Sequence, residues 1–260
     1  YDPKNPSFEK VSITQFEFQP NTHWVYFSTG RSDGTSFDDL YRVNAYSPGE
    51  PQELLAKDGG LRTFSPDGNR MALSSLRSIK VINEEGGQPV IALRYPIISQ
   101  PGDTPQVIWM ENGTGFYTVI PDNSDVSSKY LFVSADGNIS AQLASMQVDY
   151  GSPILSPDGL KVAYSKLAGT THELHVVEAS NTDTIIAAYD GAPMLIPWNW
   201  SPDSKLVTFS NAHPILLLTA GIGIPASSLT ESVTPYSLRW ISPDHFIFFR
   251  EAMPSAIRRE

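Results

Sequence analysis

Several kinds of feature that would narrow the function are missing from this sequence. Its 260 residues include no cysteine, which excludes disulfide bonds and thiol chemistry. No stretch approaches the roughly 18 consecutive apolar residues of a membrane-spanning helix, and the most apolar run, from Pro214 to Pro225, is interrupted by Gly221 and Gly223. Basic residues are outnumbered, with 18 Lys and Arg against 28 Asp and Glu, and the net charge is −10. This charge argues against nucleic-acid binding, which needs clustered Lys and Arg.

Sequence patterns of common catalytic sites are incomplete or lack their context. Gly30-Arg-Ser-Asp-Gly34 has the Gly-x-Ser-x-Gly spacing of serine hydrolases, but it lies in a connection between two expected strands and no helix is expected after it. Gly221-Ile-Gly223 lacks the third glycine of a phosphate-binding loop. The five histidines have no compact spacing with carboxylates that would hold a metal, and His172 and His175 fall on opposite faces of an extended segment. One alternative is a site centred on His213 with neighbouring acids. We expect no catalytic residues, no cofactor and no metal ion.

What the sequence does contain is a repeated phrase close to Ser-Pro-Asp-Gly, followed each time by a short apolar run. Four copies begin at Ser65, Ser156, Ser201 and Ser242, and two degenerate copies contain Pro20-Asn21 and Glu111-Asn112. The proline or its equivalent stands at positions 20, 66, 111, 157, 202 and 243, so the spacings are 46, 45, 46, 45 and 41 residues. A period in the forties with strand-like segments is typical of a β-propeller, because helical arrays of similar period need amphipathic helices, which this sequence lacks.

The second repeat shows how each blade is expected to be built. Residues 61–64 lead into the turn, residues 71–75 leave it, and residues 78–85 and 89–95 supply a third and a fourth strand. The sequence thus predicts an all-β fold, a six-bladed β-propeller of four-stranded antiparallel blades in a single domain, residues 1–260. The repeats cover about 11–57, 58–102, 103–148, 149–189, 190–230, and 231–260 together with 1–10.

The residues of the repeated turn have a structural explanation. Proline presets φ at the first central position, aspartate bonds the backbone two residues on, and glycine tolerates a positive φ. We therefore interpret the four repeated aspartates as turn-forming residues and not as catalytic ones: Asp67, Asp158, Asp203 and Asp244.

The phrases FSPDGNRMAL, LSPDGLKVAYS and WSPDSKLVTFS, together with FSTGRSDGTSFDDLYRVNA, resemble the repeats of TolB-type, WD-repeat-like propellers. The resemblance covers essentially the whole chain, and Pro20-Asn21 and Glu111-Asn112 depart from the consensus turn. It implies the propeller fold. It does not select one activity, because periplasmic interaction proteins, gating propellers of prolyl-oligopeptidase-like enzymes and some polysaccharide lyases share this repeat. No active-site motif of these families is present.

One face of the predicted ring is acidic. Connections between blades, and loops between second and third strands, emerge on the face opposite the Ser-Pro-Asp turns. Five successive junctions each carry an acid: Asp58, Asp103, Asp149, Asp190 and Glu231. Gathered around one axis, these acids would attract a cation or a segment rich in Lys and Arg. The alternative is that they solvate loops and accept backbone hydrogen bonds.

Aromatic residues divide into two groups. Trp109, Trp200 and Trp240 lie at or next to the position before the turn, and we expect them to pack between adjacent blades. Trp198 lies in a longer junction and either reaches the channel or is buried by strand alternation, and Tyr150 occupies a comparable junction. The candidate ligand-binding residues are therefore the five junction acids with Tyr150, Trp198 and His213.

These observations favour a non-catalytic binding or scaffold propeller of the bacterial cell envelope, with a protein or peptide partner, in particular a basic one, at the acidic channel mouth. A cation at the channel is compatible with the same charge, whereas nucleic acid and membrane insertion are not expected. Two alternatives stay open. One is a lyase-like carbohydrate-active propeller or the gating propeller of a prolyl-oligopeptidase-like enzyme without its catalytic domain, and the other is a structural spacer of a larger surface protein. We expect an extracytoplasmic location, with an export signal or anchor removed before Tyr1.

The last repeat is short and predicts how the ring closes. After Pro243 the sequence supplies only a second and a third strand, so a segment within residues 1–10 would complete the last blade. Deleting residues 1–10 should then lower the melting temperature by several degrees, because a long sheet edge would be exposed. An unchanged melting temperature would rule out this closure.

Overall fold

The structure is a computed structural model that describes residues 13–29, 39–47, 53–56, 61–75, 77–83, 89–96, 104–122, 127–191, 194–212, 215–231 and 239–247. All regular elements in these ranges are β-strands. Among the described residues there is no helix of the length and apolar character needed to cross a membrane. The all-β class expected from the sequence is confirmed for this part of the chain.

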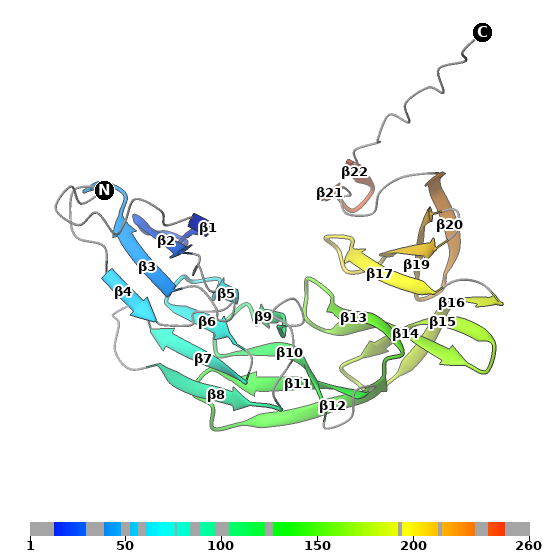
Figure 1. Ribbon diagram of the computed structural model, residues 1–260, viewed down its shortest axis with the longest axis horizontal. Coiled ribbons are helices and arrows are strands. Elements are labelled where there is room, and N and C mark those ends of the chain that lie inside the picture. The colour runs from blue at the N-terminus through cyan, green and yellow to red at the C-terminus, as the bar shows by residue number, and fades with distance from the viewer. Residues whose placement is uncertain are drawn as a thin grey trace, which may run out of the picture. The chain divides into compact units, whose positions relative to one another are not determined.

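Five four-stranded sheets and one two-stranded sheet follow one another along the chain, and neighbours within a sheet are consecutive strands (Figure 1). The first sheet comprises β1 (Ile13–Phe18), β2 (Trp24–Thr29), β3 (Asp39–Asn44) and β4 (Glu53–Ala56). The second comprises β5 (Leu61–Phe64), β6 (Arg70–Ser74), β7 (Ser78–Asn83) and β8 (Val90–Arg94). The third comprises β9 (Val107–Trp109), β10 (Gly115–Pro121), β11 (Ser127–Ser134) and β12 (Ser140–Gln147).

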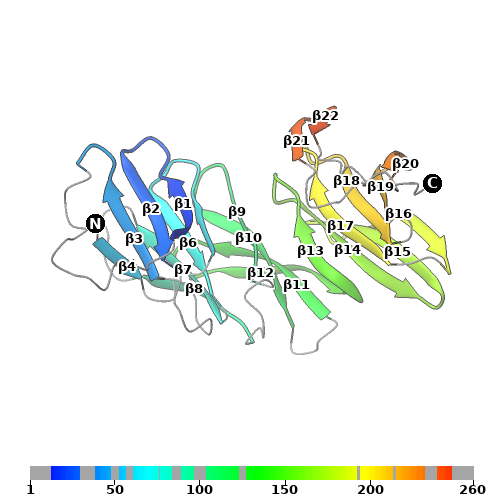
Figure 2. The same ribbon diagram turned by 45° about the horizontal axis from the view of Figure 1, so that its top comes forward.

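The fourth sheet comprises β13 (Tyr150–Leu155), β14 (Lys161–Ala168), β15 (Thr171–Glu178) and β16 (Asp183–Asp190). The fifth comprises β17 (Leu195–Trp200), β18 (Val207–Ala212), β19 (Ile215–Gly221) and β20 (Ile224–Glu231), and the last pairs β21 (Arg239–Ser242) with β22 (His245–Ile247). Figure 2 shows the strands of the fourth sheet running side by side. Four antiparallel strands per repeat, as the sequence predicts, are confirmed in five sheets.

Strand position within a sheet explains the apolar pattern. The second strands are buried along most of their length, as in β6 and β14, where four consecutive residues are buried. The fourth strands alternate instead: in β12 the buried residues Ala144 and Met146 are separated by exposed ones. An inner strand is covered on both faces by neighbouring sheets and reads as a continuous apolar run, whereas an outer strand has one face in water.

The chain forms two compact units, one of residues Tyr1–Asp125 and Leu131–Gln142, the other of residues Val126–Tyr130 and Leu143–Glu260. The core of the first unit packs Trp109 and Phe116 with aliphatic residues of β7, β8, β10 and β11. A second cluster in that unit surrounds Tyr26, Phe64 and Met71. The core of the second unit packs Trp200 and Phe209 against aliphatic residues of β14 to β19. Each cluster joins adjacent sheets of one unit.

The turn between first and second strands has one hydrogen-bonding pattern. In the second sheet, the Ser65 hydroxyl donates to Asp67 Oδ1 (2.6 Å), the Asn69 N–H donates to the same oxygen (3.1 Å), and the Arg70 N–H donates to Ser65 Oγ (2.9 Å). Gly68 has a φ of +77°, where a Cβ would lie 2.6 Å from the Pro20 carbonyl oxygen. The interpretation of the repeated aspartates as turn-forming residues is confirmed at this turn.

A further turn of the same kind joins β11 to β12, where the sequence analysis found no repeat. The Ser134 hydroxyl donates to Asp136 Oδ1 (2.5 Å), the Asn138 N–H donates to the same oxygen (3.1 Å), and Gly137 has a φ of +74°. Here Ala135 stands where the other turns have proline. The serine, aspartate and glycine therefore suffice for the pattern, and proline is an addition to it.

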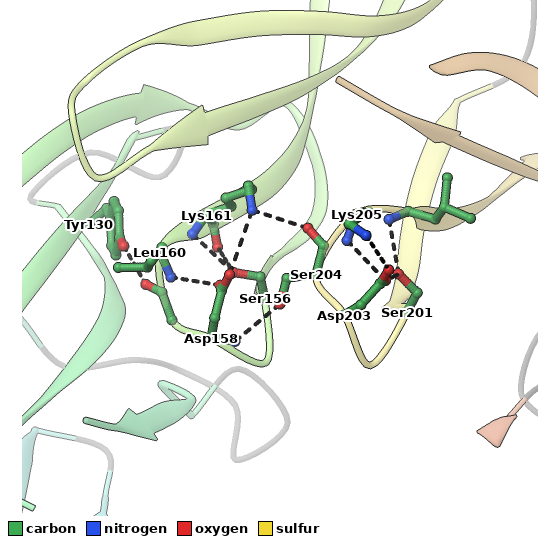
Figure 3. Close-up of polar contacts among 11 residues, drawn as sticks. Tyr130, Ser156, Asp158, Leu160, Lys161, Ser201, Asp203, Ser204 and Lys205 are labelled. Carbon is green, nitrogen blue, oxygen red and sulfur yellow. Dashed lines mark hydrogen bonds and ion pairs between the residues drawn. The ribbon is translucent and has the colours of Figure 1, made fainter. Parts of the chain in front are cut away.

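Adjacent sheets are tied together at these turns. The carbonyl of the turn's fourth residue accepts a hydrogen bond from a side chain of the preceding sheet or of its turn: Gln19 to Gly68 (2.7 Å), Arg70 to Gly113 (3.0 Å), Tyr130 to Gly159, and Lys161 to Ser204 (3.1 Å). Figure 3 shows the last two, with Lys161 also 3.6 Å from Asp158 Oδ2. The carbonyl oxygen of the fourth turn residue thus accepts a side-chain hydrogen bond in four successive turns.

A second tie recurs at the residue just before the turn. Trp109 Nε1 donates to the Thr63 carbonyl (2.9 Å), and Trp200 Nε1 donates to the Ile154 carbonyl (3.1 Å); in both cases the partners are 46 residues apart. Both tryptophans are 8% exposed. In the last sheet, Trp240 Nε1 donates to Thr208 Oγ1 (3.1 Å). The prediction that these three residues pack between adjacent sheets is confirmed.

The lowered pKa values of the turn aspartates predict how the stability of the fold depends on pH. Hydrogen bonds from the serine and from the following residues lower the pKa of Asp67, Asp136 and Asp203. For Asp158, burial opposes this decrease, but the Ser156 hydroxyl, the Leu160 N–H and Lys161 outweigh it. A carboxylate with a lowered pKa stabilises the fold above its usual pKa of about 3.9, and the contribution is lost as pH falls through the folded-state pKa.

Replacing Ser65 by alanine should therefore cost more stability at about pH 7 than at about pH 3, because protonated Asp67 no longer benefits from the Ser65 hydroxyl. Urea unfolding of Ser65→Ala and of the unaltered protein at both pH values measures the difference. An equal loss at both values would contradict a role for the Asp67 charge.

Candidate binding surface

Four of the eight predicted site residues have described side chains. Asp58, Asp103 and His213 lie outside the described residues, and Glu231 is described only as the last residue of β20. The four that remain are Asp149, Tyr150, Asp190 and Trp198, and all belong to the second unit.

Three of these residues lie at one end of the fourth sheet. Tyr150 is the first residue of β13, Asp149 precedes it, and Asp190 is the last residue of β16. The connection between β14 and β15 lies at the same end, because Ala168 pairs with Thr171 and Thr171 pairs with Asp190. The Ser156 turn between β13 and β14 lies at the other end (Figure 1). The predicted separation of acids from turns holds in this sheet.

Asp149 has a structural role. Its Oδ2 accepts a hydrogen bond from the Leu167 N–H (2.8 Å), and its Oδ1 accepts one from Gln147 Nε2 (3.3 Å). Its own N–H donates to the Ser165 carbonyl (3.1 Å). The carboxylate therefore fastens the start of β13 to the end of β14, which is the alternative role that the sequence analysis gave to the junction acids.

Asp190 is placed differently. Its side chain is exposed, and its Oδ1 accepts a hydrogen bond from the Thr171 hydroxyl across the strand pair. No backbone N–H is among the described donors to this carboxylate. Its negative charge therefore faces water at the sheet end, where a cationic group can approach it.

An aromatic pair lies at the same end of the sheet. The Tyr150 and His172 rings are 5.3 Å apart at an angle of 42°. His172 Nδ1 is buried and has no hydrogen-bond partner within the described residues. His172 pairs with Leu167 on one side and with Tyr189 on the other. Asp190 pairs with Thr171, the residue before His172, so the exposed acid and the half-buried aromatic pair lie on opposite faces of this sheet end.

Trp198 lies on β17 in the next sheet, where the pairing with β18 shifts between Pro197 and Asn199. The side chain is half-buried, and Nε1 donates to Ser210 Oγ (2.7 Å). The indole is therefore fixed within its own sheet by a neighbouring strand. Its place on β17 differs from the extended junction that the sequence analysis considered.

A polar network on the fourth sheet, built around the buried His175, was not predicted. His175 Nδ1 lies 3.1 Å from Asp183 Oδ2 and its Nε2 lies 2.9 Å from Glu173 Oε2, with the His175 side chain 6% exposed. The Tyr164 hydroxyl donates to Asp183 Oδ2 (2.7 Å), and its ring stacks on His175 at 5.0 Å. Burial and the adjacent carboxylates raise the pKa of Tyr164. The network joins β14, β15 and β16, and its members satisfy one another.

These residues do not form a metal site, since no group of three or more His, Cys, Asp or Glu residues in the described ranges has metal-binding geometry. His172 and His175 lie on opposite faces of β15, as the sequence predicts, because one contacts Tyr150 and the other Tyr164. The sequence offered no signal for the network beyond the alternation of Glu173 and His175.

A shallow pocket of about 240 Å³ lies at the turn end of the second unit, where Trp200, Ile222 and Ile224 meet Lys161 and Lys205. Sites for drug-sized molecules usually enclose about 300–1,000 Å³. Both ammonium groups already lie near turn carboxylates, Lys161 near Asp158 and Lys205 near Asp203. The opposite end of the fourth sheet therefore offers the better binding surface.

The two acids should respond differently to substitution. Asp149→Ala should lower the free energy of unfolding by about 0.5–1.5 kcal/mol, because the Leu167 N–H loses its acceptor. Asp190→Ala should change it by less than about 0.5 kcal/mol, as is usual for exposed positions. Urea unfolding of both variants tests this, and equal losses would show that Asp190 also supports the fold.

No protein-family model and no curated protein matches the sequence. Solved structures similar to the chain include one described as TolB from Agrobacterium tumefaciens, at 17% identity over 85% of this chain and 81% of that chain, with a TM-score of 0.49. TolB from Acinetobacter baumannii matches at 15% identity over 80% of this chain and 51% of that chain, also with a TM-score of 0.49. Structures of TolB proteins are thus among those similar to this chain, as the repeated phrase indicated.

The tricorn protease matches at 12% identity over 89% of this chain, with a TM-score of 0.53. The chain spans 28% of the length of that protein, and about half of the length of the Acinetobacter TolB. At such low sequence identities, the structural similarity is evidence for the fold alone. Four-stranded antiparallel sheets in consecutive order, together with this likeness, identify the architecture as a repeat of propeller type.

Proposed function

We propose that this chain is a binding or scaffold propeller that recognises a protein or peptide partner and catalyses no reaction. The observation that carries the proposal is the end of the fourth sheet, which presents the half-buried Tyr150–His172 pair on one face and the exposed Asp190 on the other. An exposed charge beside a half-buried aromatic surface is the composition of a recognition patch.

The chemistry of this patch favours a basic partner. A Lys or Arg side chain of a peptide can lie over the Tyr150 ring while a second basic residue of the same peptide approaches Asp190, and cation–π contacts at exposed sites contribute about 0.5–1 kcal/mol. The net charge of −10 would speed the approach of a basic partner to the whole protein. Because Asp149 is engaged by the backbone of Leu167, we assign recognition to Asp190 and Tyr150 and a positioning role to Asp149.

We further propose that the six repeats form one closed ring and a single domain, in which the last repeat, completed by residues 1–10, covers the first sheet. The exposed phenylalanines of β1 support this. Trp109 and Trp200, which precede their turns, are 8% exposed, whereas Phe18, at the matching position, is 62% exposed, and Phe16 is 70% exposed. In a closed ring, the last repeat would lie next to the first sheet and cover these phenylalanines.

The TolB-type repeat supports an extracytoplasmic role as part of this proposal. A propeller that gates access to a separate catalytic domain is the second candidate, and the likeness to the tricorn protease is the observation that favours it. The two candidate functions differ in whether the propeller alone binds a ligand tightly. A gating propeller needs no tight ligand of its own, whereas a recognition propeller binds its partner in isolation.

A Lys/Arg-rich peptide should bind the protein, and the affinity should fall about two- to fivefold in Asp190→Asn and in Tyr150→Ala, which is the range of one exposed charge or cation–π contact. Isothermal titration calorimetry with the basic peptide and with a Glu-rich peptide of equal length measures this. Asp244→Asn removes one exposed charge elsewhere and serves as the matched control.

Circular dichroism should show that each variant is folded before its affinity is compared. Absence of binding to the basic peptide, or equal losses in Asp244→Asn and Asp190→Asn, would exclude the fourth sheet end as the recognition surface. Equal binding of the acidic peptide would exclude the assigned charge preference.

A further inference from the structure

An aromatic column stands on the first sheet, far along the sequence from the surface described above. The Tyr46 ring stacks on His23 at 5.7 Å and 28°, and His23 stacks on Trp24 at 5.5 Å and 30°. The Arg42 guanidinium lies over Trp24, 4.4 Å from the ring centroid. Trp24 begins β2, and Arg42 lies on the adjacent strand β3 (Figure 1). Four side chains thus stack in the order Tyr46, His23, Trp24, Arg42.

The column runs from the core to water. Trp24 is half-buried and packs against the cluster of Tyr26, Phe64 and Met71. Tyr46, at the other end, is 85% exposed, the highest value among the exposed large hydrophobic side chains. One face of its ring meets His23, so the opposite face is directed to solvent. A large aromatic ring held in this way is the usual form of a stacking platform for a ligand.

Backbone hydrogen bonds hold the platform in place. The Tyr46 N–H donates to Asn44 Oδ1 (2.9 Å), the Ser47 N–H donates to the Asn44 carbonyl (3.1 Å), and the Ala45 N–H donates to the His23 carbonyl (2.8 Å). Tyr46 is therefore the third residue of a closed turn that is tied to His23. Because these hydrogen bonds fix the turn that carries Tyr46, binding would cost little ordering entropy.

The fold does not need aromatic residues at these positions. The next four repeats have other residues where this one has His23: Asn69, Thr114, Leu160 and Lys205. Where this repeat has Trp24 they have Arg70, Gly115, Lys161 and Leu206. All four of these turns close with the same backbone hydrogen bonds as the first. The aromatic column is thus an addition to the repeat, and its explanation lies in binding.

We propose that Tyr46 is the platform of a carbohydrate site for a neutral oligosaccharide. The axial C–H groups of a β-glucose-type ring make a flat apolar face that matches the open face of Tyr46, and the sugar hydroxyls can bond to the exposed His23 imidazole. The proposal does not depend on the peptide site of the fourth sheet.

Charge and shape exclude the other stacking ligands. A nucleobase stacks on tyrosine equally well, but its phosphates would be repelled by a chain of net charge −10. The same repulsion disfavours an acidic sugar. A proline-rich peptide docks in a groove lined by several open aromatic rings, whereas in this column Tyr46 lies against His23 and Trp24 packs on the core.

Cellotetraose is the probe for this site. Saturation-transfer NMR and isothermal titration calorimetry should show saturable binding to the full chain. Tyr46→Ala removes the ring face and should weaken binding by at least about fivefold. Tyr46→Phe keeps the ring face and should retain the affinity within about twofold.

Ile139→Ala, which shortens another exposed side chain of the same unit, is the matched control and should bind like the unaltered protein. Because Tyr46 is exposed, none of these variants should change the melting temperature appreciably. Absence of saturable cellotetraose binding would overturn the proposal, as would unchanged affinity in Tyr46→Ala. Tighter binding of the C6-oxidised tetrauronate, or of a proline-rich peptide that competes at Tyr46, would overturn the assigned ligand class.

Discussion

The constraint on which this structure depends is the satisfaction of backbone carbonyls where one sheet meets the next. Thr63 and Ile154 are the last-but-one residues of β5 and β13, and each carbonyl accepts the indole N–H of a tryptophan from the next sheet. A buried carbonyl without a partner would cost about 1–3 kcal/mol, so the tryptophan supplies a donor as well as apolar area. The same bond recurs at the same spacing, which fixes how one sheet is placed against the next.

The turns repeat this arrangement at the edge of the contact. Gly68, Gly113, Gly159 and Ser204 each offer a carbonyl to a side chain of the preceding sheet or of its turn, and the donors differ in chemistry: an amide, a guanidinium, a phenol and an ammonium. Only the acceptor is constant, because it belongs to the backbone of the turn. The turn end of the fold is therefore occupied by structural bonds. The opposite end is less constrained, and an acid there can fasten strands, as Asp149 does, or face water, as Asp190 does.

The sequence was sufficient for the features that the repeat imposes. The turn phrase placed the strands of the second, fourth and fifth sheets, and the position before the turn identified Trp109, Trp200 and Trp240 as contacts between sheets. The turn at Ser134 escaped notice because Ala135 replaces proline and because it joins the third and fourth strands. A search for serine and aspartate two residues apart, followed by glycine, would have found it.

The functional surfaces were harder to predict because they depend on contacts between strands. Tyr150 and His172 meet only when β13 and β15 lie in one sheet, and His23 reaches Tyr46 only through the pairing of β2 with β3. His175 joins Glu173 and Asp183 through the side-chain register of two strands. Candidate acids chosen by position in the repeat included Asp149, whose carboxylate serves the backbone.

In a repeat protein, a residue that recurs at its position in every repeat is explained by the fold, and a residue that departs from its equivalents needs another explanation. Ser65 and Asp67 have counterparts in the fourth, fifth and last sheets, and each serine donates to its aspartate as Ser65 does. His23 differs from the matching residues of the next four repeats, and its ring stacks on Tyr46. The Tyr46 side chain is exposed to water. An exposed aromatic ring gains nothing for stability by facing solvent. The departure from the repeat therefore indicates a ligand more directly than any repeated residue does, which is why the unrepeated side chains of this chain carry the argument for its function.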